Sequence, residues 1–417
     1  MINLDKCRYN ISSDTERSLK MLIENSLRWY LNKDNITFDD VQFLTTIMEI
    51  FPLLNNKEYW ESIGYDICKG IKGRLENENR IMFLGMFSGL GKEAFAVNIF
   101  ARRTGQLQTF SRKLNTLLLD FAYQYINMIE SSTLFNSTQF YDVISGVSGV
   151  LYYLLDFEWE IHDKKKITAI VNYLLRLKDE KEYLGDRRLA FFVPYESLRT
   201  NSLRMLFPSG YLDLGVAHGI IGVGIALAKA YYCGYEADKI ADFCIFLKKF
   251  YADTKKERNG IPVWPQQISW QEYINRTYAV NMFSRPSWCY GNLSIIKGFY
   301  KIDQYLRIEN SEENILILQK ILEQSSNKFN FVSPCICHGI ASLILIENTL
   351  GTVVNKQMIV KKIENQINEI KNLYENNRYI WKNDERRDFL TGVPGIICAL
   401  CGLYLEDEYT SKLFLMD

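Results

Sequence analysis

The chain has 417 residues, and its 49 Lys and Arg residues balance 49 Asp and Glu residues, so its formal net charge is zero. This balance gives no support to nucleic acid or an acidic membrane surface as the main partner. A hydrophobic content of 47% with only eight prolines is typical of an ordered, helix-rich globular protein with a large core.

The segment 1–18 contains no apolar core of the kind found in a signal peptide. No apolar stretch reaches the roughly 18 residues that a membrane span requires. Nine cysteines are scattered along the chain, which fits free or metal-bound thiols better than a disulfide framework. We therefore expect no transmembrane segment and a location in the reducing cytoplasm.

A glycine-containing motif repeats along the chain. In chain order its copies start at Phe87, Ile144, Ala217, Cys289, Cys337 and Leu390, and their first glycines are Gly89, Gly146, Gly219, Gly291, Gly339 and Gly392. The stretch 38–54 resembles a further copy without glycines. Each clear motif precedes a nearly all-apolar helical stretch, whereas amphipathic segments such as 165–178 and 358–374 lie between motifs. The repeat therefore predicts an outer helix, a Gly-rich turn and a buried inner helix.

About seven such hairpins predict an all-α protein, an α/α toroid formed by one domain of residues 1–417. The two longest intervals between motifs contain β-leaning, turn-rich sequence. We expect approximately 183–213 and 254–284 to be β-containing excursions beside the active end, forming a small inserted lobe. Ordinary long loops are an equally good interpretation of these two intervals.

The residues just before the glycines would gather where the inner helices begin. Helix N-termini carry partial positive charge and favour thiolates and other anions. Cys289 and Cys337 occupy the same place in their repeats, and His338 follows Cys337. Two thiols and an imidazole form a soft ligand set for zinc, and three protein ligands leave one position open, as in catalytic sites.

Other candidates have simpler interpretations. Cys335 could be a fourth ligand, although we interpret it as structural filler. The pair Cys398 and Cys401 has helical spacing and is expected to be core, and His162 is expected at the surface.

Three further residues carry two interpretations each. Asp142 is either a helix cap or the partner that fixes the tautomer of His218. Arg285 is either a surface ion-pair residue or a group that steadies an anion near Cys289. Tyr290 either packs or donates its hydroxyl at the site.

The motifs resemble those of the lanthionine synthetase C-like family, in particular the bacterial class I lantibiotic cyclases. The resemblance rests on Tyr141-Asp-Val-Ile-Ser-Gly-Val-Ser-Gly149, Leu214-Gly-Val-Ala-His-Gly219, Arg285-Pro-Ser-Trp-Cys-Tyr-Gly291, Cys337-His-Gly339 and Phe389-Leu-Thr-Gly392. Order, spacing and length agree over essentially the whole chain. Departures are Ser294 and Ser342 in place of glycine, Lys92 in the second repeat and the degenerate first repeat.

The resemblance implies an α/α toroid with a small inserted lobe and one zinc ion per chain, bound by Cys289, Cys337 and His338. It also implies active-site roles for Asp142, His218, Arg285 and Tyr290. The implied reaction adds peptide cysteine thiols to dehydroalanine or dehydrobutyrine, which forms (methyl)lanthionine rings in a lantibiotic precursor. The sequence leaves open which residue protonates the resulting enolate.

The implied partners are a dehydrated precursor peptide with its leader, a dehydratase and an ABC transporter. Such a complex would hold the enzyme peripherally at the inner membrane. Two other functions stay open at this point. One is a glycosidase on an α/α toroid, which would need two carboxylates at the active end. The other is a non-catalytic, zinc-containing scaffold that binds peptides or glutathione.

Overall fold

A computed structural model describes residues 2–31, 40–77, 82–132, 136–278, 286–308, 312–324, 331–351, 353–375 and 388–417. Arg285 lies outside these ranges. The chain forms two compact units. Unit 1 comprises Met1–Met82, Lys92–Leu114 and Gln319–Asp417, and unit 2 comprises Phe83–Gly91 and Asn115–Leu318.

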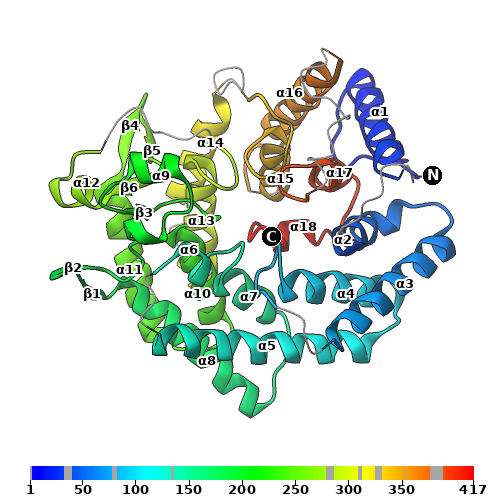
Figure 1. Ribbon diagram of the computed structural model, residues 1–417. Helices are drawn as coiled ribbons and strands as arrows, with labels where there is room; N and C mark the ends of the chain where they lie inside the picture. The colour runs from blue at the N-terminus through cyan, green and yellow to red at the C-terminus, as the bar shows by residue number, and fades with distance from the viewer. Residues whose placement is uncertain are drawn as a thin grey trace. The chain divides into compact units, whose positions relative to one another are not determined.

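Helices of two kinds alternate along the chain (Figure 1). The helices that are buried on nearly all sides are α2 (Asp40–Ile50), α4 (Leu90–Thr104), α7 (Val147–Leu154), α10 (Ile220–Tyr232), α13 (Asn292–Tyr305), α15 (Ile340–Leu350) and α17 (Val393–Cys401). Those that are exposed on one side are α1 (Ser13–Tyr30), α3 (Lys57–Leu75), α5 (Gln108–Ser131), α8 (Ile161–Leu175), α11 (Ala237–Thr254), α14 (Glu312–Glu323) and α16 (Lys356–Glu375). We call them inner and outer helices.

The amino-acid pattern explains the two kinds. All eight residues of α7 are buried, so its apolar sequence Val-Ser-Gly-Val-Leu-Tyr-Tyr-Leu suits a helix without a solvent face. In α16 the buried isoleucines are spaced three or four residues apart and form one stripe. The predicted outer helices 165–178 and 358–374 are therefore present, the first ending in the short 3₁₀ helix η3 (Arg176–Lys178).

The remaining helical elements are short. They are α6 (Thr138–Tyr141), α9 (Asn201–Leu206), α12 (Trp270–Asn275), α18 (Thr410–Leu413), η2 (Phe51–Leu53) and η4 (Tyr195–Ser197). Among the described residues no helix is long and apolar enough to cross a membrane.

A glycine begins each of the inner helices α7, α10, α13, α15 and α17. A Cβ atom added to Gly219 would lie 2.5 Å from the carbonyl oxygen of Asp213, and one on Gly222 would lie 2.3 Å from that of Val216. Both are closer than real Cβ contacts, so the turn requires glycine there. In α13 and α15, Ser294 and Ser342 stand at the second position, and their hydroxyls donate to the carbonyls of Gly291 and Gly339.

Successive turns in unit 2 are joined by backbone hydrogen bonds. We number turn positions back from the first glycine, so that Phe87, Ile144, Ala217 and Cys289 all occupy position −2. The N–H of Phe87 donates to Ile144 O (3.3 Å), that of Val143 to Ala217 O (3.1 Å), and that of Ala217 to Cys289 O (3.4 Å). Four turns therefore lie side by side in chain order.

Unit 1 has the same connection between its last two turns. The N–H of Cys337 donates to the carbonyl of Leu390 at 3.0 Å, and both residues occupy position −2. The backbone of each turn thus supports its neighbour, while the side chains at positions −1 and −2 differ from turn to turn.

In the described part of unit 2, three two-stranded antiparallel sheets interrupt the helices: β1 (Glu180–Tyr183) with β2 (Asp186–Leu189), β3 (Tyr211–Asp213) with β6 (Gln267–Ser269), and β4 (Lys256–Arg258) with β5 (Ile261–Val263). The hairpin turns Leu184-Gly185 and Asn259-Gly260 have two residues of positive φ each, as two-residue hairpins favour. The β3–β6 pair joins the two intervals that were expected to contain strands. The β content of the predicted lobe is present, although β1 begins slightly before residue 183. The assignment of residues 1–417 to one domain stays a prediction.

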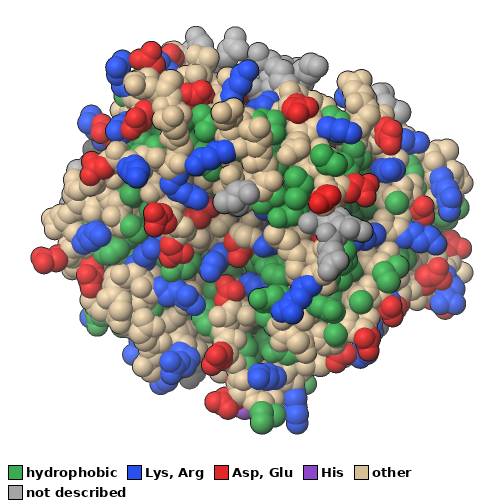
Figure 2. All heavy atoms as spheres, turned by 180° about the vertical axis from the view of Figure 1, so that it is seen from behind, with side chains coloured by type: hydrophobic (Ala, Val, Ile, Leu, Met, Phe, Trp, Pro, Cys, Tyr) green, Lys and Arg blue, Asp and Glu red, His purple; other side chains and the backbone are tan. Residues whose placement is uncertain are grey.

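Charged side chains of both signs are interspersed over the face shown in Figure 2. This distribution agrees with the zero net charge of the sequence.

Candidate active site

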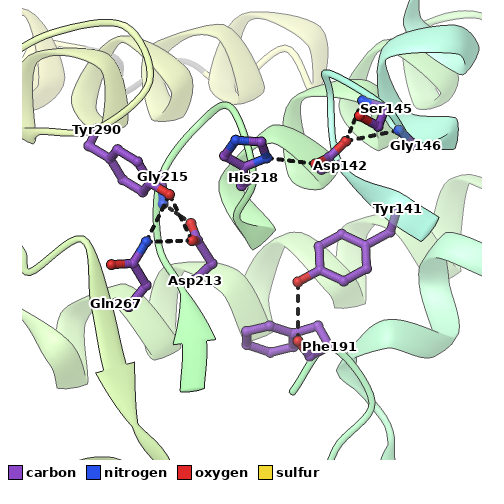
Figure 3. A network of polar contacts seen from close by, with 10 residues as sticks. All are labelled: Tyr141, Asp142, Ser145, Gly146, Phe191, Asp213, Gly215, His218, Gln267 and Tyr290. Atoms are coloured by element: carbon purple, nitrogen blue, oxygen red, sulfur yellow. Dashed lines mark hydrogen bonds and ion pairs between the residues drawn. The ribbon is translucent and has the colours of Figure 1, made fainter. Parts of the chain in front are cut away.

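Asp142 connects a turn to a histidine (Figure 3). It follows α6, whose Tyr141 hydroxyl donates to the Phe191 carbonyl at 3.1 Å, and it is buried. One carboxylate oxygen, Oδ1, accepts the N–H groups of Ser145 (2.6 Å) and Gly146 (2.8 Å). The other, Oδ2, lies 2.6 Å from His218 Nδ1. Asp142 therefore caps its turn and orients His218 at once, so both interpretations from the sequence apply.

His218 occupies position −1 of the next turn, directly before the glycine that begins α10. Its side chain is 32% exposed, so part of the ring remains accessible. Burial lowers the pKa of His218, but the hydrogen bond and charge of Asp142, with the charges of Asp213 and Cys289, raise it above its ordinary value overall. The contact with Asp142 thus stabilises the imidazolium form relative to an unpaired histidine, with Nδ1–H donated to Asp142.

Asp213 is a second buried carboxylate beside His218, and the sequence analysis did not select it. It ends β3 and is 1% exposed. Burial raises the pKa of its carboxyl above the usual value, although His218, Gln267, Gly215 and Tyr290 act in the opposite direction. Asp213 is the only Asp, Glu, Lys or Arg in the otherwise apolar stretch 207–223, and this isolation was the available signal.

Tyr290 is held by two polar partners (Figure 3). Its hydroxyl donates to Asp213 Oδ2 at 2.9 Å and accepts from Gln267 Nε2 at 2.8 Å. Burial, followed by the charge of Asp213 and this hydrogen bond, raises the pKa of Tyr290 well above its ordinary value. Tyr290 is therefore a neutral phenol whose proton is directed at Asp213.

Cys289 lies in unit 2, one residue before Tyr290, and is buried with 6% of its surface exposed. Its carbonyl accepts the N–H of Ala217, so its turn is attached to the turn of His218. Trp288, fully buried, contacts the ring of Phe87 at a centroid distance of 6.0 Å and anchors the same turn.

Cys337 and His338 lie in unit 1, at positions −2 and −1 of the turn before α15. Cys337 is 9% exposed. Cys335, which was predicted to be filler, is buried at position −4, and its thiol contacts His338. Burial raises the pKa of the Cys335 thiol, but the hydrogen bond and charge of His338 outweigh this effect and lower it overall.

Cys398, Cys401 and His162 were not predicted to take part in the site. Cys398 and Cys401 are fully buried in α17, as expected of core residues. His162 is 71% exposed, as expected of a surface histidine.

The donor types suit a zinc ion. Thiolate and imidazole are the ligands that zinc prefers, and each candidate is presented at position −1 or −2 of a rigid, hydrogen-bonded turn. Cys289 belongs to unit 2, and Cys337 and His338 belong to unit 1.

Comparisons with known proteins agree with these features. A family model described as lanthionine synthetase C-like protein matches residues 45–416. The nisin biosynthesis protein NisC of Lactococcus lactis subsp. lactis is 26% identical over 422 residues, which cover 96% of this chain and 94% of that protein. A solved structure described as nisin cyclase superposes with a TM-score of 0.76 at 23% identity, covering 97% of this chain and 98% of that one.

The chain therefore belongs to the lanthionine synthetase C-like family. Within this family it is a lanthipeptide cyclase of the class I lantibiotic type, and so an enzyme. The structural match also confirms the predicted α/α toroid fold.

Proposed function

We propose that this enzyme adds cysteine thiols of a dehydrated precursor peptide to dehydroalanine or dehydrobutyrine, forming (methyl)lanthionine rings with the help of one zinc ion. The observation that carries the proposal is the 2.6 Å contact of Asp142 with His218. The turn that holds His218 is itself hydrogen-bonded to the turn of Cys289. This arrangement combines an acid–base pair with a soft metal ligand.

Cys289, Cys337 and His338 are the proposed zinc ligands. Their donor types, their turn positions and the family of the chain support this assignment. A zinc ion held by these residues would supply Lewis acidity that lowers the pKa of a substrate thiol. With two protein thiolates among its ligands, the substrate sulfur would keep its nucleophilic character.

His218 is the proposed proton carrier. A new C–S bond forms at the β-carbon of the dehydro residue, and the electrons of its double bond move into an enolate. The Nε2–H of the His218 imidazolium is the group that can protonate the α-carbon, because Nδ1–H is donated to Asp142. Loss of the thiol proton balances this step, and partial exposure of His218 lets solvent restore its proton.

Arg285 and Tyr290 complete the proposed site. Arg285 is proposed to stabilise the enolate, in line with the interpretation of this residue as one that steadies an anion near Cys289. Tyr290 donates its hydroxyl to Asp213, so we assign it to the shape of the site and not to proton transfer.

The structure favours neither alternative function. A glycosidase needs two available carboxyl groups, but Asp142 is engaged by two backbone N–H groups and His218. Asp213 is engaged by Tyr290, Gln267 and the Gly215 N–H. A scaffold without catalysis would not need a buried carboxylate that orients a partly exposed histidine.

The proposed partners are the leader-bearing precursor peptide, a dehydratase and an ABC transporter. The proposed location is the cytoplasm, with peripheral association at the inner membrane through their complex.

Incubation with a dehydrated precursor peptide tests the proposal. Ring closure leaves the peptide mass unchanged but removes free thiols, so alkylation followed by mass spectrometry should show fewer alkylated cysteines. Zinc content is measured on the same protein. An unchanged count of alkylated cysteines with zinc-loaded enzyme would reject the proposed reaction for that peptide class.

A further inference from the structure

Asp213 has contacts that no step of the proposed reaction uses. Its side chain is buried where β3 ends, two residues before Gly215, and it accepts three hydrogen bonds. Oδ1 accepts the Gly215 N–H at 3.0 Å, and Oδ2 accepts Gln267 Nε2 and the Tyr290 hydroxyl, each at 2.9 Å. Burying a carboxylate away from water costs free energy unless hydrogen-bond donors such as these satisfy its oxygens.

These contacts join three separate segments (Figure 3). Asp213 leads into the turn of His218, Tyr290 belongs to the turn of Cys289, and Gln267 comes from β6, which pairs with β3. Gln267 Nε2 also donates to the Tyr290 hydroxyl at 2.8 Å, so the three side chains form a closed triangle. The triangle fixes the phenol oxygen from two directions.

The ring of Tyr290 is also held at its other end. A Cβ atom on Gly215 would lie 2.4 Å from Tyr290 Cδ1 and 2.4 Å from the carbonyl of Cys289. Glycine at this position therefore lets the Cys289–Tyr290 backbone approach the strand that carries Asp213. Because the ring lies close to Gly215 and the hydroxyl is bound to Asp213, any swing of Tyr290 toward a substrate would break these contacts.

We infer that Asp213 is a positioning residue for ring formation, which acts through Tyr290 to hold the turn of Cys289 in register with the turn of His218. The inference rests on the proposed function, because it assigns Cys289 and His218 to one reaction. The proton of Tyr290 is committed to Asp213, and the contribution of Tyr290 is the placement of its turn. Reacting groups that are displaced by about 1 Å lose on the order of 10²-fold in rate.

A double-mutant cycle tests the inference with the full-length, zinc-loaded enzyme and a dehydrated precursor peptide. Asp213→Asn should lower kcat on the order of 10²-fold. Zinc content should stay unchanged, and KM should change far less than kcat. Tyr290→Phe should reproduce this loss. At a pH below the His218 titration, where loss of the Asp213 charge leaves His218 protonated, adding Asp213→Asn to Tyr290→Phe should then change kcat by no more than about twofold, because coupled residues are not additive.

Asp142→Asn is the matched control for the cycle. In the described part of the chain Asp142 hydrogen-bonds Ser145, Gly146 and His218 but no member of the triangle, so its effect should persist in full in the Tyr290→Phe background. If the losses of Asp213→Asn and Tyr290→Phe multiply, or if Asp213→Asn loses zinc, the inference is wrong. Since the wild-type enzyme would still cyclise peptide in that case, the proposed function would stand.

Gln267→Leu covers the case in which Asp213→Asn fails to fold. It removes one donor from the triangle without changing the buried carboxylate, and it should lower kcat by about tenfold. This loss should vanish in the Tyr290→Phe background. A loss of the same size in both backgrounds would overturn the inference independently of Asp213.

Discussion

The turns of Asp142 and Asp388 are both capped by an aspartate, but the second carboxylate oxygen has a different kind of partner in each. Both aspartates occupy position −4 of a turn before an inner helix. Asp142 Oδ1 accepts the N–H groups of Ser145 and Gly146, and Asp388 Oδ1 accepts the N–H of Thr391. The second oxygen of Asp142 binds His218, whereas that of Asp388 accepts the hydroxyl of Thr391 within its own turn.

This comparison separates what the repeat provides from what the site adds. The repeat places a carboxylate where it can cap a turn, and this needs only local sequence. The acid–base pair arises because a neighbouring turn presents a histidine at position −1. The same holds for position −2: the repeat fixes where this residue lies, but its side chain differs. It is Ile144, Ala217 or Leu390 in some turns and a cysteine in two others.

The largest effect is expected at the cysteines of position −2. Cys289→Ala or Cys337→Ala should release zinc and reduce ring formation to the uncatalysed rate. A free thiol, with a pKa of about 8.5, is mostly protonated at neutral pH. Metal analysis and alkylation of the product measure both effects, and circular dichroism should show that the helices remain.

Cys335→Ala is the control, because this thiol lies at position −4. It should retain zinc. Full zinc retention in both Cys289→Ala and Cys337→Ala would reject the ligand assignment, and zinc loss in Cys335→Ala would show that position −4 also contributes a ligand.

A smaller but still large effect is expected when the two aspartates are compared directly. Asp142→Asn should lower ring formation by about 10²–10⁴-fold, the range for loss of general acid–base catalysis, with zinc retained. Asp388→Asn should mainly affect stability, by about 0.5–1.5 kcal/mol, because only a local hydrogen bond weakens. Initial rates and thermal unfolding distinguish the two. Equal losses of rate would show that the turn, and not the histidine contact, matters.

The same comparison predicts a pH effect. Because Asp142 raises the pKa of His218, ring formation should fall as the pH rises through this raised pKa, where the imidazolium is lost. Protonation of His218 also stabilises the fold below the ordinary histidine pKa of about 6.5, and this contribution disappears as the pH rises through the raised value.

NMR of isotope-labelled histidine measures this titration, since the chain has only three histidines. The His218 signal should titrate above the ordinary value and move to lower pH in Asp142→Asn. An unchanged midpoint in that variant would contradict the assigned pairing.

The smallest effect is expected at the serines that replace glycine in two turns. The hydroxyl of Ser342 donates to Gly339 O at 2.7 Å, so Ser342→Ala should lose about 1 kcal/mol of stability and no activity. The opposite change, Gly222→Ser, should be much more destabilising, because a Cβ would lie 2.3 Å from Val216 O. Urea unfolding of the two variants checks this order, and equal destabilisation would contradict it.

The features that depend on local sequence pattern could be predicted from the sequence. Apolar stretches after the glycines form inner helices, and the places of Asp142 and His218 in neighbouring repeats indicated their contact. The role of Asp213 was not predicted, because it depends on the pairing of β3 with β6. Gln267 in β6 follows Asp213 by more than fifty residues in the chain. The contact of Cys335 with His338 was not predicted, because Cys335 was taken to lie outside the repeat register, although it occupies the same position −4 as Asp142. Arg285 lies outside the described residues and stays a prediction.

In the proposed mechanism the cysteine turns hold metal while the Asp142–His218 pair moves a proton. Purified His218→Asn separates these two roles, with zinc content and ring formation measured on the same sample. We expect about one zinc per chain, unchanged peptide binding and a loss of ring formation of about 10²–10⁴-fold. A metal-free variant would make His218 a ligand, and a near wild-type rate would show that solvent supplies the proton; either result would overturn this division of roles.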